Sequence, residues 1–378
     1  MKVTVVDCSV SGHRETYYKQ FCRTLLAMGH ETSLIAPDGS GLDASIRFEP
    51  IRTRRLLALP AGNTLKKKWI VLCNALILCL NLAALHKQLR EIHPDRVFFA
   101  CLDDMLPTCI PLWLFDRLLP YRWGGLLVQA SLPKPRLGIV DARRCLRAKY
   151  CTGVGVLNEY AVDELKPFQS HILLFPDFAD TSAPNTAYPL REQIRTQANG
   201  RNIIALLGSV HTRKGTDLFI QTVEQLPPDA YFFVIAGKSS LDESQEAALQ
   251  RFAQTHENCL FSLERIPDES CFNALVEEST LLFAVYRNFK GSSNMLTKAA
   301  LFGKPIIVSQ GYCMGHRVDD YHTGMAIGET DPAACATAIE YLCTHPQALS
   351  EARFDLYARD HSTGKLTECF HQLLNDLS

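Results

Sequence analysis

Short runs of apolar and β-branched residues alternate with amphipathic stretches along both halves of this chain, and no other feature limits its fold so strongly. In the first half, the order strand, helix, strand is predicted for residues 2–7, 16–28 and 31–36. The second half repeats this order over residues 202–207, 216–225 and 231–236. Strands without polar alternation need helices on both faces, which is typical of parallel sheets. The pattern therefore predicts an α/β protein with two Rossmann-like domains.

The composition argues against some classes of function. The chain has 378 residues, and its 39 Lys and Arg nearly balance 40 Asp and Glu, giving a net charge of −1. This balance argues against nucleic-acid binding. The 14 cysteines include no C-x-x-C pair and no Cys/His cluster at zinc spacing, so we expect reduced thiols in a cytoplasmic protein. Because strand-like residues begin at Lys2, we expect no secretory signal.

One segment is apolar enough to suggest contact with a membrane. Residues 69–85 are apolar except for Asn74 and Asn81, and three lysines at 66–68 precede them. This length lies at the lower limit for a membrane-spanning helix, and the two amides disfavour spanning. A buried helix is one interpretation. Docking on a membrane surface through residues 66–85 and the nearby Arg52, Arg54 and Arg55 is another.

Two loops of the first half carry candidate functional groups. Gly12 and His13 follow the first strand, and His13 is either an acid–base or substrate-orienting group or a loop histidine that faces water. Asp103 and Asp104 follow the strand predicted for residues 95–101, at the strand end where ligands bind. The two aspartates either bind acceptor hydroxyls or cap a helix from Met105. They do not form a D-x-D motif, so we expect no metal.

The second half opens with a basic loop. Residues 208–215 follow a buried strand and contain Ser209, Arg213 and Lys214 just before a predicted helix. Two adjacent cations are suited to neutralising the two phosphates of a diphosphate. The alternative is a solvated basic turn at the start of the helix.

A second small loop precedes another short helix. Gly291, Ser292, Ser293 and Asn294 lead into a helix predicted for residues 295–302. Free backbone N–H groups and the positive end of a helix dipole would favour a phosphate here. A Ser or Asn at this place is also an ordinary N-cap.

These loops, an Ala-Ala pair in the helix, and Gly303-Lys304-Pro305 before a buried strand resemble the nucleotide-sugar site of GT-B glycosyltransferases. The resemblance is to the retaining enzymes of family 4. It implies a GT-B fold, with two Rossmann-like domains facing across a cleft. Residues 1–180 would bind the acceptor, 181–200 would be a linker, and 201–359 would bind the nucleotide sugar. Residues 360–378 would pack back on the first domain.

The resemblance also implies an activity. The chain would move a sugar from a nucleotide-diphosphate sugar to a saccharide, glycolipid or small-molecule acceptor, with retention and without a metal or other cofactor. The candidate catalytic residues are His13, Asp103 and Asp104, although family members often have histidines in the loop where the two aspartates stand. The implied donor-binding residues are Gly12, Ser209, Arg213, Lys214, Lys290, Gly291, Ser292, Ser293, Asn294 and Lys298.

The chain departs from the family at central positions. Lys290 and Lys298 stand where most members have two glutamates, one for the sugar or leaving phosphate and one for the ribose hydroxyls. Ser209 stands where the family has an arginine. An ammonium group donates and cannot accept from ribose hydroxyls, but it can neutralise a leaving diphosphate. The alternatives are a non-catalytic sugar-nucleotide-binding or scaffold protein, and a membrane-associated transferase with a lipid-linked acceptor.

Overall fold

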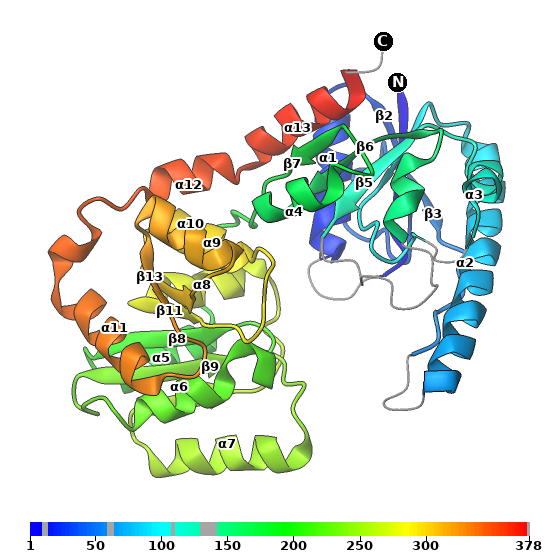
Figure 1. Cartoon of the computed structure of the whole chain (residues 1–378). Coiled ribbons are helices and arrows are strands. Elements are labelled where there is room, and N and C mark those ends of the chain that lie inside the picture. Colours follow the sequence, from blue (N-terminus) through cyan, green and yellow to red (C-terminus); the bar gives the residue numbers. More distant parts are fainter. Residues whose placement is uncertain (10–13, 59–63, 107–109, 129–141, 376–378) are drawn as a thin grey trace. The chain divides into compact units, whose positions relative to one another are not determined.

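The chain folds into two compact units, each built around one parallel sheet (Figure 1). The computed structural model describes residues 1–9, 14–58, 64–106, 110–128 and 142–375. The N-terminal unit comprises Met1–Pro176 and Thr363–Ser378, and the C-terminal unit comprises Asp177–Ser362. The predicted α/β fold with two Rossmann-like domains is confirmed.

The sheet of the N-terminal unit has seven strands in the order β3-β2-β1-β4-β5-β6-β7. Every neighbouring pair is parallel. The central strands are buried and apolar, as the sequence pattern requires. The strands are β1 (Lys2–Val6), β2 (Glu31–Ala36), β3 (Arg47–Pro50), β4 (Arg96–Phe99), β5 (Trp123–Leu127), β6 (Cys151–Val156) and β7 (Ile172–Leu174).

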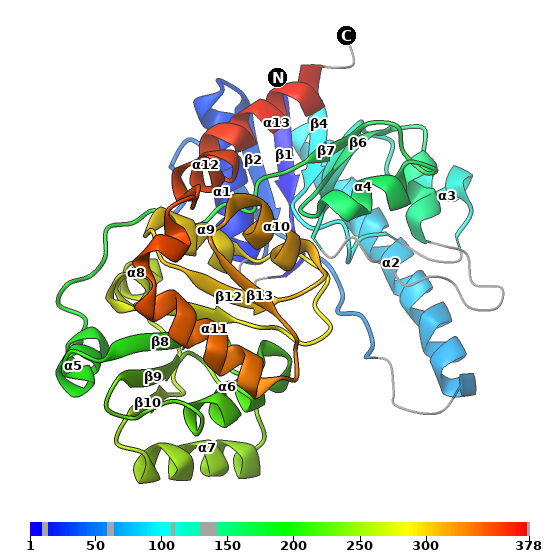
Figure 2. The same ribbon diagram turned by 60° about the vertical axis from the view of Figure 1, so that its left-hand side comes forward.

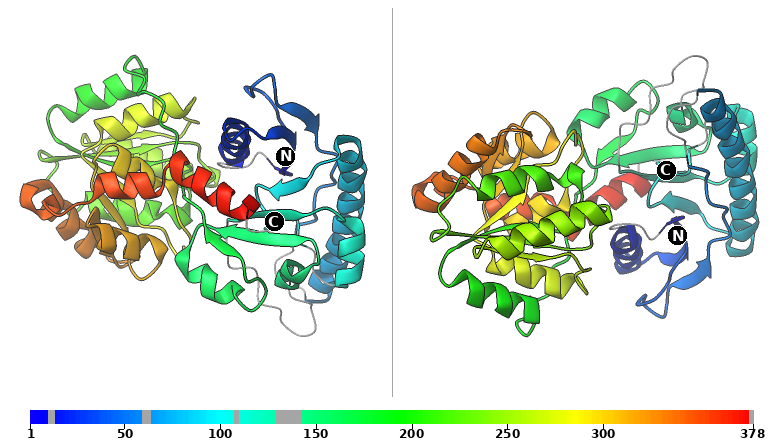
Figure 3. Two further views of the ribbon diagram at one scale, coloured as in Figure 1. Left: turned by 90° about the horizontal axis from the view of Figure 1, so that it is seen from above. Right: turned by 90° about the horizontal axis from the view of Figure 1, so that it is seen from below.

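Helices cover both faces of this sheet (Figure 3). On one face, α1 (Arg14–Ala27) and α13 (Thr363–Asn375) pack on a cluster of phenylalanines from distant parts of the chain: Phe21, Phe98, Phe175 and Phe370. On the other face lie α2 (Thr64–Ile92), α3 (Leu112–Leu118), η1 (Ala142–Arg147) and α4 (Glu159–Leu165). The last helix of the chain thus belongs to the N-terminal unit.

The sheet of the C-terminal unit has six parallel strands in the order β10-β9-β8-β11-β12-β13. The strands are β8 (Asn202–Leu207), β9 (Tyr231–Ala236), β10 (Cys259–Ser262), β11 (Leu281–Ala284), β12 (Ile306–Ser309) and β13 (Gly324–Ile327). One face is covered by α5 (Pro189–Ala198), α8 (Glu269–Glu278), α9 (Asn294–Leu301), α10 (Cys313–Tyr321) and α12 (Phe354–Asp360). The other is covered by α6 (Thr216–Val223), α7 (Glu243–Thr255) and α11 (Pro332–Thr344). Two 3-10 turns complete the unit, η2 (Thr212–Lys214) and η3 (Pro346–Leu349).

The segment 181–200, expected to be the linker, lies within the C-terminal unit and contains α5. Ile194 and Ala198 of this helix are buried in the core of that unit. Arg191 and Arg195 both pair with Glu278 of α8, at 3.0 Å and 2.7 Å. The polar composition therefore reflects ion pairs within the unit and not a solvated connection.

In both sheets the chain begins in the middle and then builds outward in two directions. The order reverses between β1 and β4 in the N-terminal unit, and between β8 and β11 in the C-terminal unit. Ligands of such sheets bind beyond the carboxyl ends of the strands at this reversal. Functional side chains are therefore expected in the loops after β1, β4, β8 and β11.

Candidate functional site

The loop after β8 lies tightly against its neighbours because two glycines allow it. Gly215 has a φ of +73°, and a Cβ there would lie 2.2 Å from the carbonyl oxygen of Val285. Gly237, after β9, has a φ of +145°, and its Cβ would lie 1.7 Å from the Gly208 oxygen. Since real Cβ atoms do not approach backbone oxygens so closely, only glycine fits at these two positions.

The loops after β8 and β11 are joined directly. The backbone N–H of Arg287 donates to the carbonyl oxygen of Arg213 at 2.8 Å. The Arg287 guanidinium forms an ion pair with Asp217, in the first turn of α6. Lys214 Nζ lies 3.7 Å from the centroid of the Tyr286 ring, within the range of a cation–π contact. These contacts fix residues 213–217 and 285–287 as one rigid surface.

This surface is positively charged. Arg213 and Lys290 are exposed, and Lys214 and Arg287 are half-buried. Arg213 lies 5.7 Å from the Phe289 ring centroid, and Lys290 lies 5.9 Å from that of Tyr312. Aromatic rings orient these cations without removing their charge. A group of cations at the reversal point of a parallel sheet is suited to binding a diphosphate.

The loop expected to bind phosphate, residues 291–294, makes contacts within its own unit. All four residues are half-buried, and Gly291 packs against the ring of Phe289. Ser293 is the N-cap of α9, and its hydroxyl accepts from the Met295 N–H at 3.4 Å. This is the N-cap alternative, and a capped helix still directs its N-terminal dipole toward the loop. Ser209 is exposed in the loop after β8.

Ser292 belongs to a buried polar network at the base of this loop. Its hydroxyl donates to the Asp177 carboxylate at 2.5 Å and accepts from Arg317 at 2.6 Å. The Thr297 hydroxyl donates to the Asp177 carbonyl oxygen at 2.5 Å. Asp177 and Arg317 are both nearly inaccessible to solvent. The network therefore holds the start of α9 in place. The sequence did not indicate that these polar side chains contact one another.

His361 completes this network as a neutral group. Its Nδ1 accepts the backbone N–H of Asp177 at 3.0 Å. Burial, with the nearby Arg317 cation, lowers the pKa of His361 to about 2. The imidazole is therefore uncharged at neutral pH, and its Nδ1 acts as a hydrogen-bond acceptor.

Lys298 was expected to bind the donor, but its ammonium group is paired with side chains of the protein. The side chain is buried, with 1% of its surface exposed. Its Nζ lies 2.8 Å from Glu269 Oε2 and 2.6 Å from Asn273 Oδ1, both on α8. The ammonium group thus joins α9 to α8. These contacts favour a structural role for Lys298.

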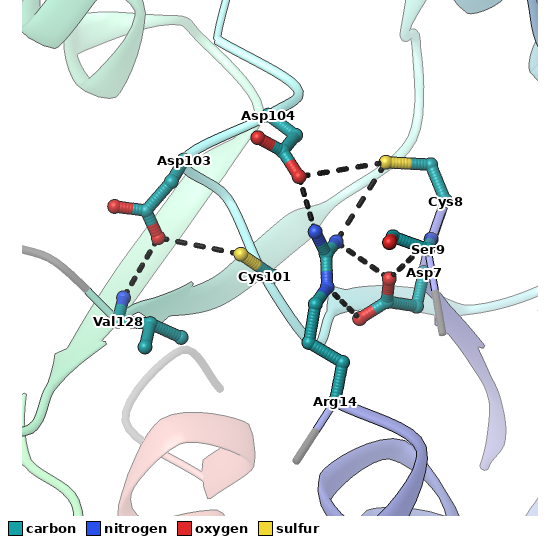
Figure 4. A network of polar contacts seen from close by, with 8 residues as sticks. All are labelled: Asp7, Cys8, Ser9, Arg14, Cys101, Asp103, Asp104 and Val128. Carbon is teal, nitrogen blue, oxygen red and sulfur yellow. Dashed lines mark hydrogen bonds and ion pairs between the residues drawn. The ribbon is translucent and has the colours of Figure 1, made fainter. Parts of the chain in front are cut away.

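In the N-terminal unit, the loops after β1 and β4 are joined by an arginine (Figure 4). Arg14, the first residue of α1, lies between two carboxylates and pairs with Asp7 at 2.5 Å and with Asp104. Burial raises the pKa of Asp7 to about 6, although Arg14 opposes this shift. Neither Asp7 nor Arg14 was predicted from the sequence, although Asp7 ends a strand beside the reversal point.

The predicted aspartates have defined positions. Asp103 Oδ2 accepts the backbone N–H of Val128 at 2.8 Å, and the Cys101 thiol lies 3.4 Å away. Asp104 is half-exposed and turned toward Arg14. Residues 103–105 form a turn and α3 begins only at Leu112, so the described residues contain no helix that the aspartates could cap from Met105.

The predictions for Gly12 and His13, and for the absence of a metal site, are compared with the structure last. Gly12 and His13 lie outside the described residues, so their assignments stay predictions. Within the described ranges, no group of three or more His, Cys, Asp or Glu side chains is placed to hold a metal ion.

Comparison with known proteins identifies the fold. Residues 201–345 match the model of the family "Glycosyl transferases group 1". A search of curated proteins finds no match. Solved structures match over 99% to 100% of the chain at a sequence identity of 11% to 15%, so they establish the fold alone.

Three of these structures illustrate the match. Sucrose-phosphate synthase from Thermosynechococcus elongatus is 14% identical, with a TM-score of 0.69 over 99% of this chain and 97% of its own. WaaG, a glycosyltransferase involved in lipopolysaccharide biosynthesis, is 15% identical, with a TM-score of 0.67 over 100% of both chains. Anabaena HepE in complex with UDP-glucose is 12% identical, with a TM-score of 0.68 over 100% of both. The chain therefore has the GT-B fold, and residues 201–345 of its C-terminal unit match the group 1 glycosyltransferase model.

Proposed function

We propose that this chain, a GT-B protein whose residues 201–345 match the group 1 glycosyltransferases, transfers a sugar from a nucleotide-diphosphate sugar to an acceptor hydroxyl. One observation carries the proposal. The cations of the loops after β8 and β11 form a fixed surface at the reversal point of the sheet, inside the segment that matches the family. Such a surface is suited to a diphosphate.

The donor diphosphate binds between these loops. Arg213 and Lys214 neutralise the phosphates, and Arg287, held by Asp217, keeps the two loops in register. As the bond between the anomeric carbon and the diphosphate oxygen breaks, negative charge grows on the leaving group. Fixed cations stabilise that charge most strongly in the transition state. Lys290, exposed in the loop after β11, adds to this effect.

The acceptor binds in the N-terminal unit. Asp104 has an exposed carboxylate held by Arg14, and Asp103 lies beside it at the end of β4. A positioned carboxylate can accept a hydrogen bond from an acceptor hydroxyl. The acceptor oxygen forms the new bond to the anomeric carbon and passes its proton to the departing nucleoside diphosphate. We assign Asp103 and Asp104 to orienting this hydroxyl.

The finer assignments rest on the family resemblance. We propose that the configuration at the anomeric carbon is retained and that no metal or other cofactor takes part. Because HepE is solved with UDP-glucose, UDP-sugars are the first donors to test. We propose a cytoplasmic location, since the cysteines described are all free thiols.

The experiment is a donor-cleavage assay. The purified chain is incubated with UDP-, GDP-, ADP- and TDP-glucose, with and without EDTA, and release of the nucleoside diphosphate is measured. We expect release from one nucleotide class, unchanged by EDTA, and a product of the same anomeric configuration by NMR. Loss of activity in EDTA would contradict metal independence, and an inverted product would contradict retention.

A second candidate is a protein that binds sugar nucleotides without turnover. It is favoured by the lysines at positions 290 and 298. Saturable donor binding with no release of nucleoside diphosphate, across a panel of saccharide and glycolipid acceptors, would support it over the transferase. Failure of all four donors to bind would contradict both candidates.

A further inference from the structure

Helix α2 is unusual for a helix of an α/β domain. Residues 66–92 are long and apolar enough to cross a membrane by length and composition, and their most apolar 18 residues have a mean hydropathy of 2.0. However, only 28% of the most apolar window is buried in the protein. Figures 1 and 2 both show the N-terminal half of α2 extending past the sheet that its C-terminal half covers. Among the described residues, this helix therefore leaves much of its apolar surface exposed.

The exposed surface is a continuous stripe. Trp69, Leu72, Leu76 and Leu80 have 65%, 57%, 63% and 42% of their surfaces exposed. Their spacing of three or four residues puts them on one side of the helix. From the first to the last, the stripe is about 16 Å long, at 1.5 Å per residue. An apolar stripe of this kind on a soluble domain marks a surface for a partner or a membrane.

The opposite side of α2 is fixed in the core. Leu82, Leu85 and Leu89 are fully buried against the sheet of the N-terminal unit. Passage of the whole helix through a bilayer would remove these side chains from the core. The helix is therefore suited to lying along a surface and not to crossing a membrane.

Three amide side chains, spaced seven residues apart, bind a second segment to α2. Asn74, Asn81 and Gln88 all use their amides on the backbone of residues 50–57. Asn74 pairs with both the N–H and the carbonyl oxygen of Leu57, at 2.8 Å and 3.0 Å. Asn81 does the same with Arg54, at 2.7 Å and 2.9 Å. The asparagines that disfavour spanning thus hold the segment after β3 along the helix.

This segment and the two ends of α2 carry positive charge. The side chains of Arg52, Arg54 and Arg55 in the segment are exposed, as are Lys66, Lys67 and Lys68 at the start of α2 and Lys87 and Arg90 near its end. Residues 50–90 hold eight of the 39 Lys and Arg residues of the chain and none of its 40 Asp and Glu residues. The apolar stripe is therefore bordered by cations, in a chain whose net charge is −1.

We propose that α2 and residues 50–57 form a docking surface for an anionic lipid membrane, with the helix in the membrane plane. The apolar stripe enters the interface between head groups and acyl chains, while the surrounding Lys and Arg contact anionic head groups. A second copy of this chain fits less well, because a self-complementary pairing would place two cationic borders together. The proposal stands independently of the transferase activity.

The experiment is flotation of the full chain with vesicles. We expect the protein to float with phosphatidylglycerol-containing vesicles at low salt, to remain below with pure phosphatidylcholine, and to be released by high salt. The variant Trp69→Ser/Leu76→Ser should reduce the bound fraction more than tenfold, and Lys66→Ala/Lys67→Ala/Lys68→Ala should do the same. Tyr341→Ser is the control, since Tyr341 is 43% exposed on α11 of the other unit. Circular dichroism checks that each variant is folded.

Three results would overturn the proposal. Flotation that is equal for the wild type and the Trp69/Leu76 variant would exclude the stripe. Absence of flotation with anionic vesicles, together with a dimer that the same variant dissociates, would assign the surface to a second copy. Protein that resists release by high salt and by alkaline washing would indicate insertion across the bilayer.

Discussion

The two units share a topology and differ in the charge of the loops at their reversal points. In the C-terminal unit, the loops after β8 and β11 gather four cations and one carboxylate: Arg213, Lys214, Arg287, Lys290 and Asp217. In the N-terminal unit, the loops after β1 and β4, with the start of α1, gather three carboxylates and one cation: Asp7, Asp103, Asp104 and Arg14. The same strand order therefore presents a basic surface in one unit and an acidic one in the other.

This difference separates what the fold determines from what the loops determine. A parallel sheet with a central reversal brings strand ends together at one place, whatever ligand is bound. The charge of the loops then decides whether that place suits a diphosphate or a neutral, hydroxyl-rich molecule. In the function proposed above, the two units thus divide donor binding and acceptor binding by charge.

The largest expected effect is on the basic loop. Arg213→Ala/Lys214→Ala should lower donor turnover by about 1,000-fold, because the leaving diphosphate loses two fixed cations. Steady-state kinetics with the preferred donor measures this change. Arg251→Ala, an exposed arginine on α7, is the matched control and should leave turnover unaltered. Equal activity of the double variant and the control would place the diphosphate elsewhere.

The acidic loop should respond differently. Asp104→Ala should lower kcat/KM for the acceptor by about 100-fold while leaving donor affinity unchanged, because the carboxylate orients only the acceptor hydroxyl. Transfer kinetics and donor titration together check this. Asp163→Asn, on the exposed face of α4, serves as the control. A parallel fall in donor affinity would break the division between the units.

Lys298 separates stabilisation from donor binding. Lys298→Met should destabilise the C-terminal unit by about 2 kcal/mol, because Glu269 and Asn273 lose their shared partner and Glu269 is partly solvated. Chemical denaturation measures this loss. Lys290→Met, at an exposed position, should leave stability unchanged and weaken donor binding. If Lys298→Met keeps its stability and loses donor affinity, the lysine contacts the donor directly.

The smallest expected effect concerns the buried carboxylate of the acidic loop. The pKa of Asp7 is raised to about 6 by burial, so the folded chain binds a proton that the unfolded chain releases. This group therefore contributes stability below its unfolded pKa and loses that contribution as the pH rises through about 6. When the pH falls from 7 to 5, the free energy of unfolding of the wild type should rise by about 1 kcal/mol relative to that of Asp7→Asn. Denaturation at the two pH values tests this, and a difference of opposite sign would contradict the assignment.

Much of the fold was predictable, because buried parallel strands are apolar throughout and helices are amphipathic. The positions of Arg213 and Lys214 were predictable for the same reason, since they follow a strand that the sequence defines. The helix α5 was not predicted, because its arginines are satisfied by Glu278, far away in the sequence. Composition does not show whether a charged residue is solvated or paired.

The roles of individual polar residues were harder to predict. Lys298 is four residues into a helix, and its spacing does not reveal that it turns toward Glu269. Arg14 and Asp7 form one network with Asp104 only after β1 and β4 become neighbours. Such contacts depend on strand order, which a single sequence does not specify. The asparagines of α2 were recognised as unusual, but their backbone partners were visible only in the structure.

The central claim is that the basic surface of the C-terminal unit binds the diphosphate of a nucleotide sugar. Titration calorimetry of the wild type and of Arg213→Ala/Lys214→Ala with UDP-, GDP-, ADP- and TDP-glucose, without metal, tests it most directly. We predict saturable binding of one nucleotide class by the wild type and at least about tenfold weaker binding by the variant. Equal affinity of the two proteins would contradict the claim, as would absence of binding to all four donors.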